Sequence, residues 1–253
     1  MLTVKRWEEI IRILERNGSI DVNSLSEQLG VTTKTIRQDL AELEARGLLE
    51  RVHGGAVFKS NGSGVFPIRE RKQHNLREKE RIAGAALKYI ENGDTIILDG
   101  GSTTLQLAKK LADRRLVVIT NDLIIAGELL HHESVTLYLS GGKLRREGVY
   151  TLLGREAERT ISCYNVNKLF LATSALDFNQ GLTVLSEEEA EIKKAMLHAA
   201  KEVICLADYS KFHKAALVSF AQLEVVNHLI TDSRISDTDL EYLTGQGIKV
   251  DVV

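Results

Sequence analysis

The sequence predicts an α/β protein with a small N-terminal part rich in helices and a larger C-terminal domain built on a mainly parallel sheet. Two observations support this prediction. Over residues 1–58, apolar side chains recur at the spacing of amphipathic helices, and two short apolar runs follow them. From residue 80 onward, short apolar runs alternate with helical patterns, as they do in sheets whose parallel strands are joined by helices.

The composition is that of an ordinary globular protein. Of the 253 residues, 43% are hydrophobic and 27% are charged, which suits one large domain or two modest ones. The net charge of −2 gives no general attraction to nucleic acid. No apolar run approaches the roughly 20 residues that span a bilayer, and the first residues lack the layout of a secretion signal. We therefore expect a cytoplasmic protein without a membrane partner.

Three helices are expected in the N-terminal part, each with an apolar face and a residue that tolerates a helix end. The first has apolar residues over 7–14 and ends at Asn17-Gly18, the second opens at Asn23 or Ser24 and closes at Gly30, and the third opens at Thr32 or Thr33 and runs to about Gly47. A short helix, a turn that contains glycine and a second helix with a polar outer face form the helix-turn-helix pattern of DNA-binding proteins.

The third helix has two different faces. Ile36, Leu40 and Leu43 fall on one face and are expected in a core. The opposite face carries side chains suited to DNA: Thr33, Lys34, Thr35, Arg37 and Gln38. Arginine matches the edge of guanine and glutamine the edge of adenine. Taken alone, the pattern also fits an ordinary surface helix, and the neighbouring elements favour DNA binding.

Two short strands are expected after these helices, at residues 48–52 and 56–58 around His53-Gly54-Gly55. They would form a wing whose Arg51 and His53 contact the sugar-phosphate backbone or the minor groove. Residues 1–58 hold eight Lys and Arg against nine Asp and Glu. DNA affinity must therefore come from the placement of a few cations and from dimerisation.

Residues 59–67 are rich in glycine and serine and include the chain's only proline, which indicates a domain boundary. A basic run follows at residues 68–79; it fits a solvated charged helix and also a segment that grazes DNA. We expect a DNA-binding domain at 1–58, a linker at 59–79 and a ligand-binding domain at 80–253.

The C-terminal domain is expected to alternate strands and helices. The strands fall at residues 95–99, 117–120, 135–140, 168–173, 202–207, 228–231 and 248–252, and the helices at 81–90, 105–111, 122–131, 187–200 and 237–244. In such sheets, small ligands bind beyond the carboxyl ends of the strands. Three polar turns that contain glycine fall at these ends.

The turn at residues 99–104 is the most informative, because glycines between a strand and a helix rich in hydroxyl groups make a cradle for anions. Gly101, Ser102 and Thr103 would donate to an anion, and Asp99 would accept from a sugar hydroxyl. Further candidates at later turns are Asn121, Gly142, Arg145 and Lys211. Each also fits an ordinary turn, cap or surface residue.

The N-terminal part resembles the DeoR family of bacterial repressors. The matching residues are Thr35-Ile36-Arg37-Gln38-Asp39-Leu40, Leu43-Glu44, Gly47 and Arg51-Val52-His53-Gly54-Gly55-Ala56. The family usually has a second arginine at the position of Gln38, so the operator preference of this chain would differ. Asp39 belongs to the pattern, but it is expected to pair locally, with Arg46 or another donor.

The C-terminal domain resembles the effector domain of the same family, in which an Asp-Gly-Gly/Ala-Ser-Thr turn, a Thr-Asn, a Gly-Gly pair and an Asp-Ser-Ser-Lys-Phe segment recur in this order. The resemblance implies an α/β fold like that of ribose-5-phosphate isomerase and the CoA-transferases, and a phosphorylated sugar as effector. It carries over Asp99, Ser102, Thr103, Asn121 and Lys211 as pocket residues. Tyr209 replaces the usual serine, and residues 172–176 replace a Gly-x-Asp-Gly motif.

We therefore expect a repressor of a carbohydrate-utilisation operon that binds double-stranded operator DNA as a homodimer or homotetramer and is released by a phosphorylated sugar. The alternative is a sugar-phosphate isomerase with an appended DNA-binding module, for which Asp99 or Asp177 would be the general base. No catalytic or metal site and no cofactor are predicted. His131-His132-Glu133 are consecutive rather than spaced as metal ligands, and Cys163 and Cys205 lack partners at metal spacing.

Overall fold

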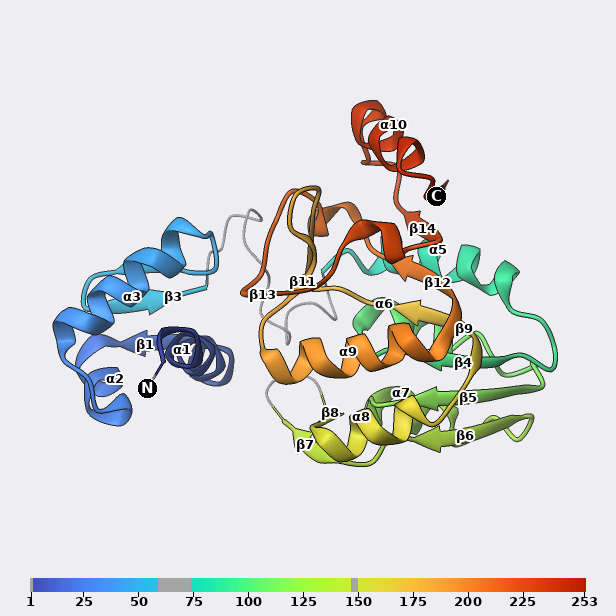
Figure 1. Ribbon diagram of the computed structural model, residues 1–253, viewed down its shortest axis with the longest axis horizontal. Coiled ribbons are helices and arrows are strands. Elements are labelled where there is room, and N and C mark those ends of the chain that lie inside the picture. Colours follow the sequence, from blue (N-terminus) through green and yellow to red (C-terminus); the bar gives the residue numbers. More distant parts are fainter. Residues whose placement is uncertain (1, 59–73, 147–149) are drawn as a thin grey trace.

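A computed structural model of the chain describes residues 2–58, 74–146 and 150–253. It shows a small N-terminal unit beside a larger unit built around a sheet (Figure 1). Most of the expected linker, including its proline and the basic residues 69–72, lies outside the described residues. Among those that are described, no helix is both long enough and apolar enough to cross a membrane.

The N-terminal unit is a three-helix domain with a wing. It contains α1 (Thr3–Asn17), β1 (Ser19–Asp21), α2 (Val22–Leu29), α3 (Thr33–Ala45), β2 (Glu50–Val52) and β3 (Gly55–Val57). Thr32 caps α3 by accepting from the Thr35 amide at 3.2 Å, as expected. The cap of α2 is Asp21, which accepts from the amides of Asn23 and Ser24, so this helix begins earlier than the sequence predicts.

The wing is a three-stranded sheet in the order β1-β3-β2, whereas the sequence predicted a two-stranded hairpin. The additional strand, β1, precedes α2 and is too short to show an alternating pattern. A Cβ at Gly55 would lie 1.9 Å from the carbonyl oxygen of Ile20, so only glycine allows β1 and β3 to approach. Leu48 and Leu49, expected in the first strand, lie in the buried core before β2.

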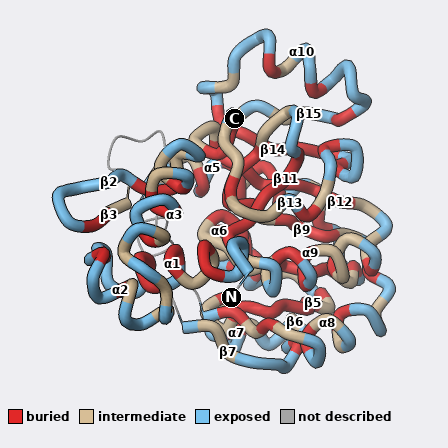
Figure 2. Tube along the Cα trace, turned by 60° about the vertical axis from the view of Figure 1, so that its left-hand side comes forward, coloured by how far each residue is buried: buried red, intermediate tan, exposed pale blue. Residues whose placement is uncertain are grey.

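The C-terminal unit is organised by seven parallel strands in the order β15-β14-β12-β9-β4-β5-β6, which confirms the predicted parallel α/β fold. Their bounds are β4 (Thr95–Leu98), β5 (Leu116–Thr120), β6 (Val135–Leu139), β9 (Val166–Leu171), β12 (Ala200–Leu206), β14 (His228–Thr231) and β15 (Lys249–Val252). Figure 2 shows β5 and β9 as mostly buried, whereas the wing strand β2 and half of α2 are exposed.

Helices cover both faces of this sheet, because alternate side chains of each strand point to opposite faces. Ile97 and Ile119 pack in one buried cluster with residues of α8 (Arg155–Ser162) and α9 (Glu187–Ala199). The intervening Ile96, Leu98 and Val118 pack in a second cluster, on the other face. That cluster includes residues of α5 (Leu76–Ala86), α6 (Ser102–Ala108) and α7 (Leu123–Leu129).

Several short elements escaped the sequence analysis. They are an antiparallel sheet of β10 (Ala175–Asp177), β11 (Gly181–Val184) and β13 (Val218–Ala221), the hairpin of β7 (Lys143–Arg145) and β8 (Thr151–Leu153), the helix α8 and the 3-10 turns η1 (Leu87–Tyr89), η2 (Tyr209–Lys211) and η3 (Leu223–Val225). The expected C-terminal helix is α10 (Asp237–Gly245). Arg145 therefore lies on a strand and not in a solvated loop.

The two units share buried surface. Ala175, Leu185 and Ala216 of the C-terminal unit belong to the same apolar cluster as the core of the N-terminal helices. The start of α9 faces α1 (Figure 1), and the Glu187 amide donates to Glu8 of α1 at 2.6 Å. The position of the N-terminal helices is thus tied to the helix that follows β11.

Candidate functional site

The outer face of α3 carries the residues that the sequence assigned to DNA. Ile36 and Leu40 are buried beneath it, whereas Lys34, Arg37 and Gln38 are exposed and Thr33 and Thr35 are partly exposed. In the wing, Arg51 and His53 are exposed, and the Arg51 guanidinium lies 4.0 Å from the carboxylate of Glu44. These side chains form one polar surface of helix and wing.

Asp39 holds α3 against α1 and does not pair with Arg46. It accepts from Arg6 Nε at 2.6 Å and from Trp7 Nε1 at 2.8 Å, and all three side chains are buried. Arg46 instead donates to Glu42 and lies over the Trp7 ring. A buried carboxylate that accepts three hydrogen bonds fixes the rotation of α3, and with it the direction in which Arg37 points.

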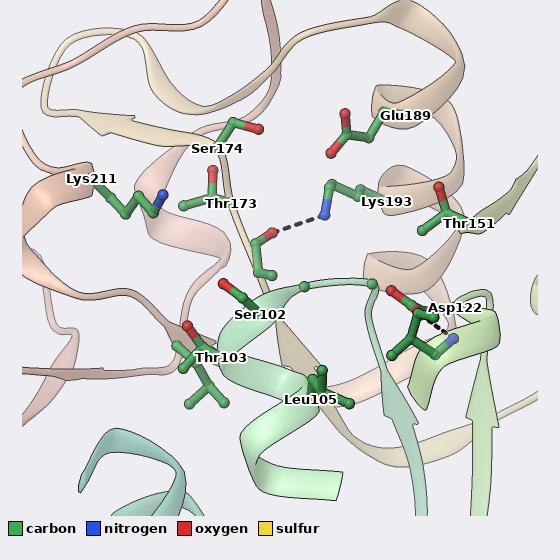
Figure 3. A pocket seen from close by; sticks show the side chains of 15 residues that line it. Ser102, Thr103, Leu105, Asp122, Thr151, Thr173, Ser174, Glu189, Lys193 and Lys211 are labelled. Atoms are coloured by element: carbon green, nitrogen blue, oxygen red, sulfur yellow. Dashed lines mark hydrogen bonds between the residues drawn. The ribbon is translucent and has the colours of Figure 1, made fainter. Parts of the chain in front are cut away.

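A small cavity of about 60 Å³ lies where β4, β9 and β12 end, the edge at which parallel sheets bind ligands. It is lined by Gly100, Gly101, Ser102, Thr103, Leu105, Asp122, Ile124, Thr151, Ala172, Thr173, Ser174, Glu189, Lys193, Leu206 and Lys211. Figure 3 shows Lys193 and Lys211 reaching toward the start of α6 from two sides. Of the residues predicted to bind an effector, the cavity brings together Gly101, Ser102, Thr103 and Lys211.

The two glycines before α6 are required by space. A Cβ at Gly101 would lie 2.7 Å from the Cβ of Ala172, and one at Gly100 would lie 2.6 Å from Cγ2 of Thr151. The backbone of the turn therefore packs directly against β8 and the end of β9. Because the two glycines have no side chains of their own, the backbone of the turn lines the cavity together with Ser102 and Thr103.

Asp99 lies behind the cavity wall and is not among the described residues that line it. It is 1% exposed, and it accepts from Lys193 Nζ at 2.5 Å and from the Ala172 amide at 2.9 Å. Burial raises the pKa of Asp99, and the Lys193 ammonium offsets part of that rise. Asp99 was expected to accept from a sugar hydroxyl. In the structure it instead binds Lys193 and sets the position of that side chain.

Three other predicted effector residues also lie outside the lining that the structure describes. Asn121 bridges two loops, accepting from the Gly100 amide at 3.2 Å and donating to the Leu152 carbonyl at 3.3 Å. At Gly142, whose φ is +103°, a Cβ would lie 2.6 Å from the Leu153 carbonyl oxygen. Arg145 pairs with two carboxylates. These contacts tie the three residues to neighbouring segments of the chain.

The sequence analysis missed the polar residues on α9 that line the cavity. It assigned Glu189 to a helix start, yet Glu189 lines the cavity one turn before Lys193. Lys193 interrupts a buried stripe of Ala190, Ile192 and Met196. A lysine within such a stripe needs a buried partner, and this signal could have predicted the pair with Asp99.

Lys211 is 8% exposed and lies after β12, on η2. Burial disfavours the charged form of Asp208, but the nearby Lys211 ammonium and a hydrogen bond from Ser210 outweigh it and lower the pKa of Asp208. Lys193 and Lys211 thus bring two cations, each balanced by a buried aspartate, to a cavity that also contains hydroxyl groups.

Comparison with known proteins decides the family. Residues 6–61 match the DeoR-like helix-turn-helix domain, and residues 74–233 match the DeoR C terminal sensor domain. The chain belongs to the DeoR family.

The DeoR-family relatives align over nearly the whole chain. An uncharacterized HTH-type transcriptional regulator of Bacillus subtilis, YulB, is 37% identical over 100% of this chain and 98% of its own length. A putative aga operon transcriptional repressor of Escherichia coli O157:H7 is 35% identical over 99% and 94%. The glycerol-3-phosphate regulon repressor of E. coli K12 is 30% identical over 100% of both chains.

Solved structures match the chain in part. The probable sor operon regulator of Shigella flexneri aligns with a TM-score of 0.45 and 13% identity, over 69% of this chain and 90% of that one. A ribose-5-phosphate isomerase in complex with phospho-erythronic acid aligns with a TM-score of 0.41 and 18% identity, over 54% of each chain.

Two departures from the DeoR-family pattern have structural consequences. Tyr209 turns away from the cavity and donates to Asp239 of α10 at 3.0 Å, while its ring stacks on Phe212. Where many members have a Gly-x-Asp-Gly motif, this chain places Thr173 and Ser174 in the cavity wall. The cavity wall of this chain therefore has two hydroxyl groups at this place.

Proposed function

We propose that this DeoR-family protein is a transcriptional repressor of a carbohydrate-utilisation operon and that a phosphorylated sugar releases it from its operator. The observation that carries the proposal is the cavity at the carboxyl ends of the strands, which combines a turn of glycines with two lysines, a carboxylate and several hydroxyl groups. The polar surface of α3 and the wing supports operator binding. We keep residues 1–58, 59–79 and 80–253 as the proposed DNA-binding domain, linker and effector domain.

The phosphate is proposed to bind between Lys211 and the turn that leads from Gly101 into α6. Lysine supplies a point charge, and the Gly101 amide and the hydroxyls of Ser102 and Thr103 donate to phosphate oxygens. The Gly100 amide already donates to Asn121. Such contacts are effective in a buried site, because the lower effective dielectric strengthens them.

The sugar hydroxyls are proposed to contact the opposite wall. Glu189 accepts from hydroxyl groups, and the Ser174 hydroxyl can donate or accept. The Thr173 hydroxyl donates to backbone carbonyl oxygens, so toward a sugar it acts as an acceptor. Lys193 is held by Asp99, so its position is set before a ligand arrives. A preorganised polar wall costs less ordering on binding and discriminates among sugars by the placement of their hydroxyls.

On DNA, Arg37 and Gln38 are proposed to read base edges, while Thr33, Lys34, Thr35, Arg51 and His53 contact the backbone. The N-terminal domain has no net positive charge, so one copy would bind weakly. A homodimer or homotetramer that reads two half-sites would supply the missing affinity, and a change in the spacing of its heads would release it.

Sensing is favoured over isomerisation by the contacts of the two candidate bases. Asp99 is held by Lys193 behind the wall, and Asp177 accepts from the amides of Asn179 and Gln180 in a turn. Neither carboxylate is among the described residues that line the cavity. The relatives named above are transcriptional regulators or repressors, which agrees with this reading.

A thermal-shift screen of the full chain would test the proposal, with glycerol 3-phosphate, ribose 5-phosphate, glucose 6-phosphate, fructose 6-phosphate and their unphosphorylated forms. A phosphorylated sugar that binds the folded state is expected to raise Tm by mass action and to lower the affinity for a mapped operator. Steady conversion of the sugar, or a preference for unphosphorylated forms, would contradict the proposal.

A further inference from the structure

Arg145 occupies the contact between the DNA-binding head and the effector domain. Its Nη2 lies 2.8 Å from Oε2 of Glu15 on α1, and its Nη1 lies 3.1 Å from Oε2 of Glu189 on α9. The two carboxylates are 130 and 44 residues away from it in the sequence. One guanidinium thus joins two segments that belong to different domains.

These three side chains are shielded from water. The side chains of Arg145, Glu15 and Glu189 are 12%, 2% and 17% exposed. Burial opposes the charged form, but Glu189 and Glu15 outweigh it and raise the pKa of Arg145. Charges in this environment interact strongly, and a change at one partner is felt by the others.

Glu189 is the member of the trio that reaches the effector cavity. It lines the cavity together with Lys193, which follows it by one turn of α9 (Figure 3). The same part of α9 contacts the head a second time, through Glu187, whose amide donates to Glu8 and whose side chain pairs with Lys5. The first turn of α9 is therefore both a wall of the cavity and a support of α1.

We propose that Arg145 is a positioning residue that couples the effector cavity to the DNA-binding head by sharing its guanidinium between Glu189 and Glu15. This inference rests on the proposed function for the class of effector, a phosphorylated sugar. Without effector, both carboxylates hold Arg145 and α1 is fixed against α9. A sugar hydroxyl that donates to Glu189 withdraws part of that carboxylate from Arg145, and the attachment of α1 weakens.

The first experiment needs no effector. Amide hydrogen exchange of α1 (Thr3–Asn17) would be followed in the full chain for Glu15→Gln, Glu189→Gln and the double variant, since glutamine keeps the shape of each side chain. We expect Glu189→Gln, a change in the cavity wall, to speed exchange in α1 at least about fivefold. The double variant should exchange no faster than Glu15→Gln alone, because both changes break one bridge.

Glu188→Gln is the matched control. Glu188 lies in the same turn of α9 and pairs with Lys143, but both of these side chains are largely exposed. Its replacement is expected to leave exchange in α1 unchanged. Unchanged exchange in the Glu189→Gln variant, or fully additive effects of the two bridge variants, would overturn the coupling through Arg145.

The second experiment measures operator affinity with and without each of glycerol 3-phosphate, ribose 5-phosphate, glucose 6-phosphate and fructose 6-phosphate. The probe that releases the wild type should still raise the Tm of Glu15→Gln but should change its operator affinity less than twofold. Full release of Glu15→Gln would overturn the coupling. If no probe binds the wild type but exchange is coupled as expected, the proposed effector class fails and the inference about Arg145 stands.

Discussion

The DNA-binding head and the effector cavity are built in opposite ways. The candidate DNA contacts of the head lie within one helix and the wing that follows it, from Thr33 to His53. The cavity draws its polar side chains from separate segments between residues 100 and 211. Local periodicity alone decides which residues lie on one face of a helix. A site at the carboxyl ends of parallel strands forms only when the order of the strands in the sheet brings separate segments together.

The charged side chains of the two sites differ in exposure and in pairing. Arg37 is exposed, so we expect its removal to affect the proposed contact with DNA and little else. Lys193 is 2% exposed and bound to a buried aspartate, so its removal affects folding as well as binding. Substitutions in the head should therefore change function with little change in stability, whereas substitutions of buried charges at the cavity should change both.

The largest expected effect is that of Lys193→Met. It leaves the Asp99 carboxylate buried without its ammonium, and we expect the free energy of unfolding to fall by about 3–5 kcal/mol. Urea denaturation of the effector domain measures this loss, and Asp99→Asn in the same chain should restore part of it. A loss of less than about 1 kcal/mol would show that Asp99 does not depend on Lys193.

Arg37→Ala is expected to cost about 1–3 kcal/mol of specific operator binding without a change in unfolding, because the side chain is exposed. Fluorescence anisotropy with a mapped operator and with random duplex measures the loss of preference. The control is Arg12→Ala, which removes an exposed arginine paired with Glu9 on α1. Equal losses for both variants would remove Arg37 from base recognition.

Lys211→Gln is expected to weaken binding of the phosphorylated sugar identified by thermal shift by roughly 10–100-fold, since a hydrogen bond to a charged group is worth about 1.5–3 kcal/mol. Operator affinity without sugar should be unchanged. Isothermal titration would compare it with Lys201→Gln, which removes an exposed lysine of β12. Wild-type affinity of Lys211→Gln would place the phosphate elsewhere.

The smallest expected effect concerns acid. The pKa of Asp208 lies below its ordinary value of 3.8, so its carboxylate stabilises the folded state above that pH, and the contribution is lost as the pH falls through the folded pKa. Asp208→Asn should therefore be less stable than the wild type near pH 7, with a difference that shrinks below about pH 4. Urea denaturation at several pH values measures the difference in the free energy of unfolding. A difference that grows as the pH falls would contradict a lowered pKa of Asp208.

Much of the fold could be predicted because it follows from local patterns. The apolar spacing of Ile36, Leu40 and Leu43 predicted a buried face of α3, and all three are buried. The apolar runs predicted seven strands, all of which lie in the parallel sheet. The antiparallel strands β10, β11 and β13 were missed because each has only three or four residues, and β10 and β11 are largely buried, without the alternation that marks a strand.

The candidate site was predicted less completely, and the reason is visible in Asp99 and Arg145. Both follow or end strands, as ligand-binding residues do, and both were predicted to contact the effector. The structure instead shows Asp99 bound to Lys193, and Arg145 bound to Glu15 and Glu189, which are far away in the sequence. Spacing along the chain contains no information about such distant partners.

The sequence by itself determined the three helices of the head, the seven strands of the parallel sheet, the turn of glycines before α6 and the polar face of α3. These properties depend on neighbours within a few residues, so a linear pattern records them. Only the tertiary structure decided which polar groups line the cavity, which polar groups form buried ion pairs, and where α9 contacts α1. Those outcomes depend on the order of strands and on burial, because a charge removed from water takes whichever partner the fold brings within reach.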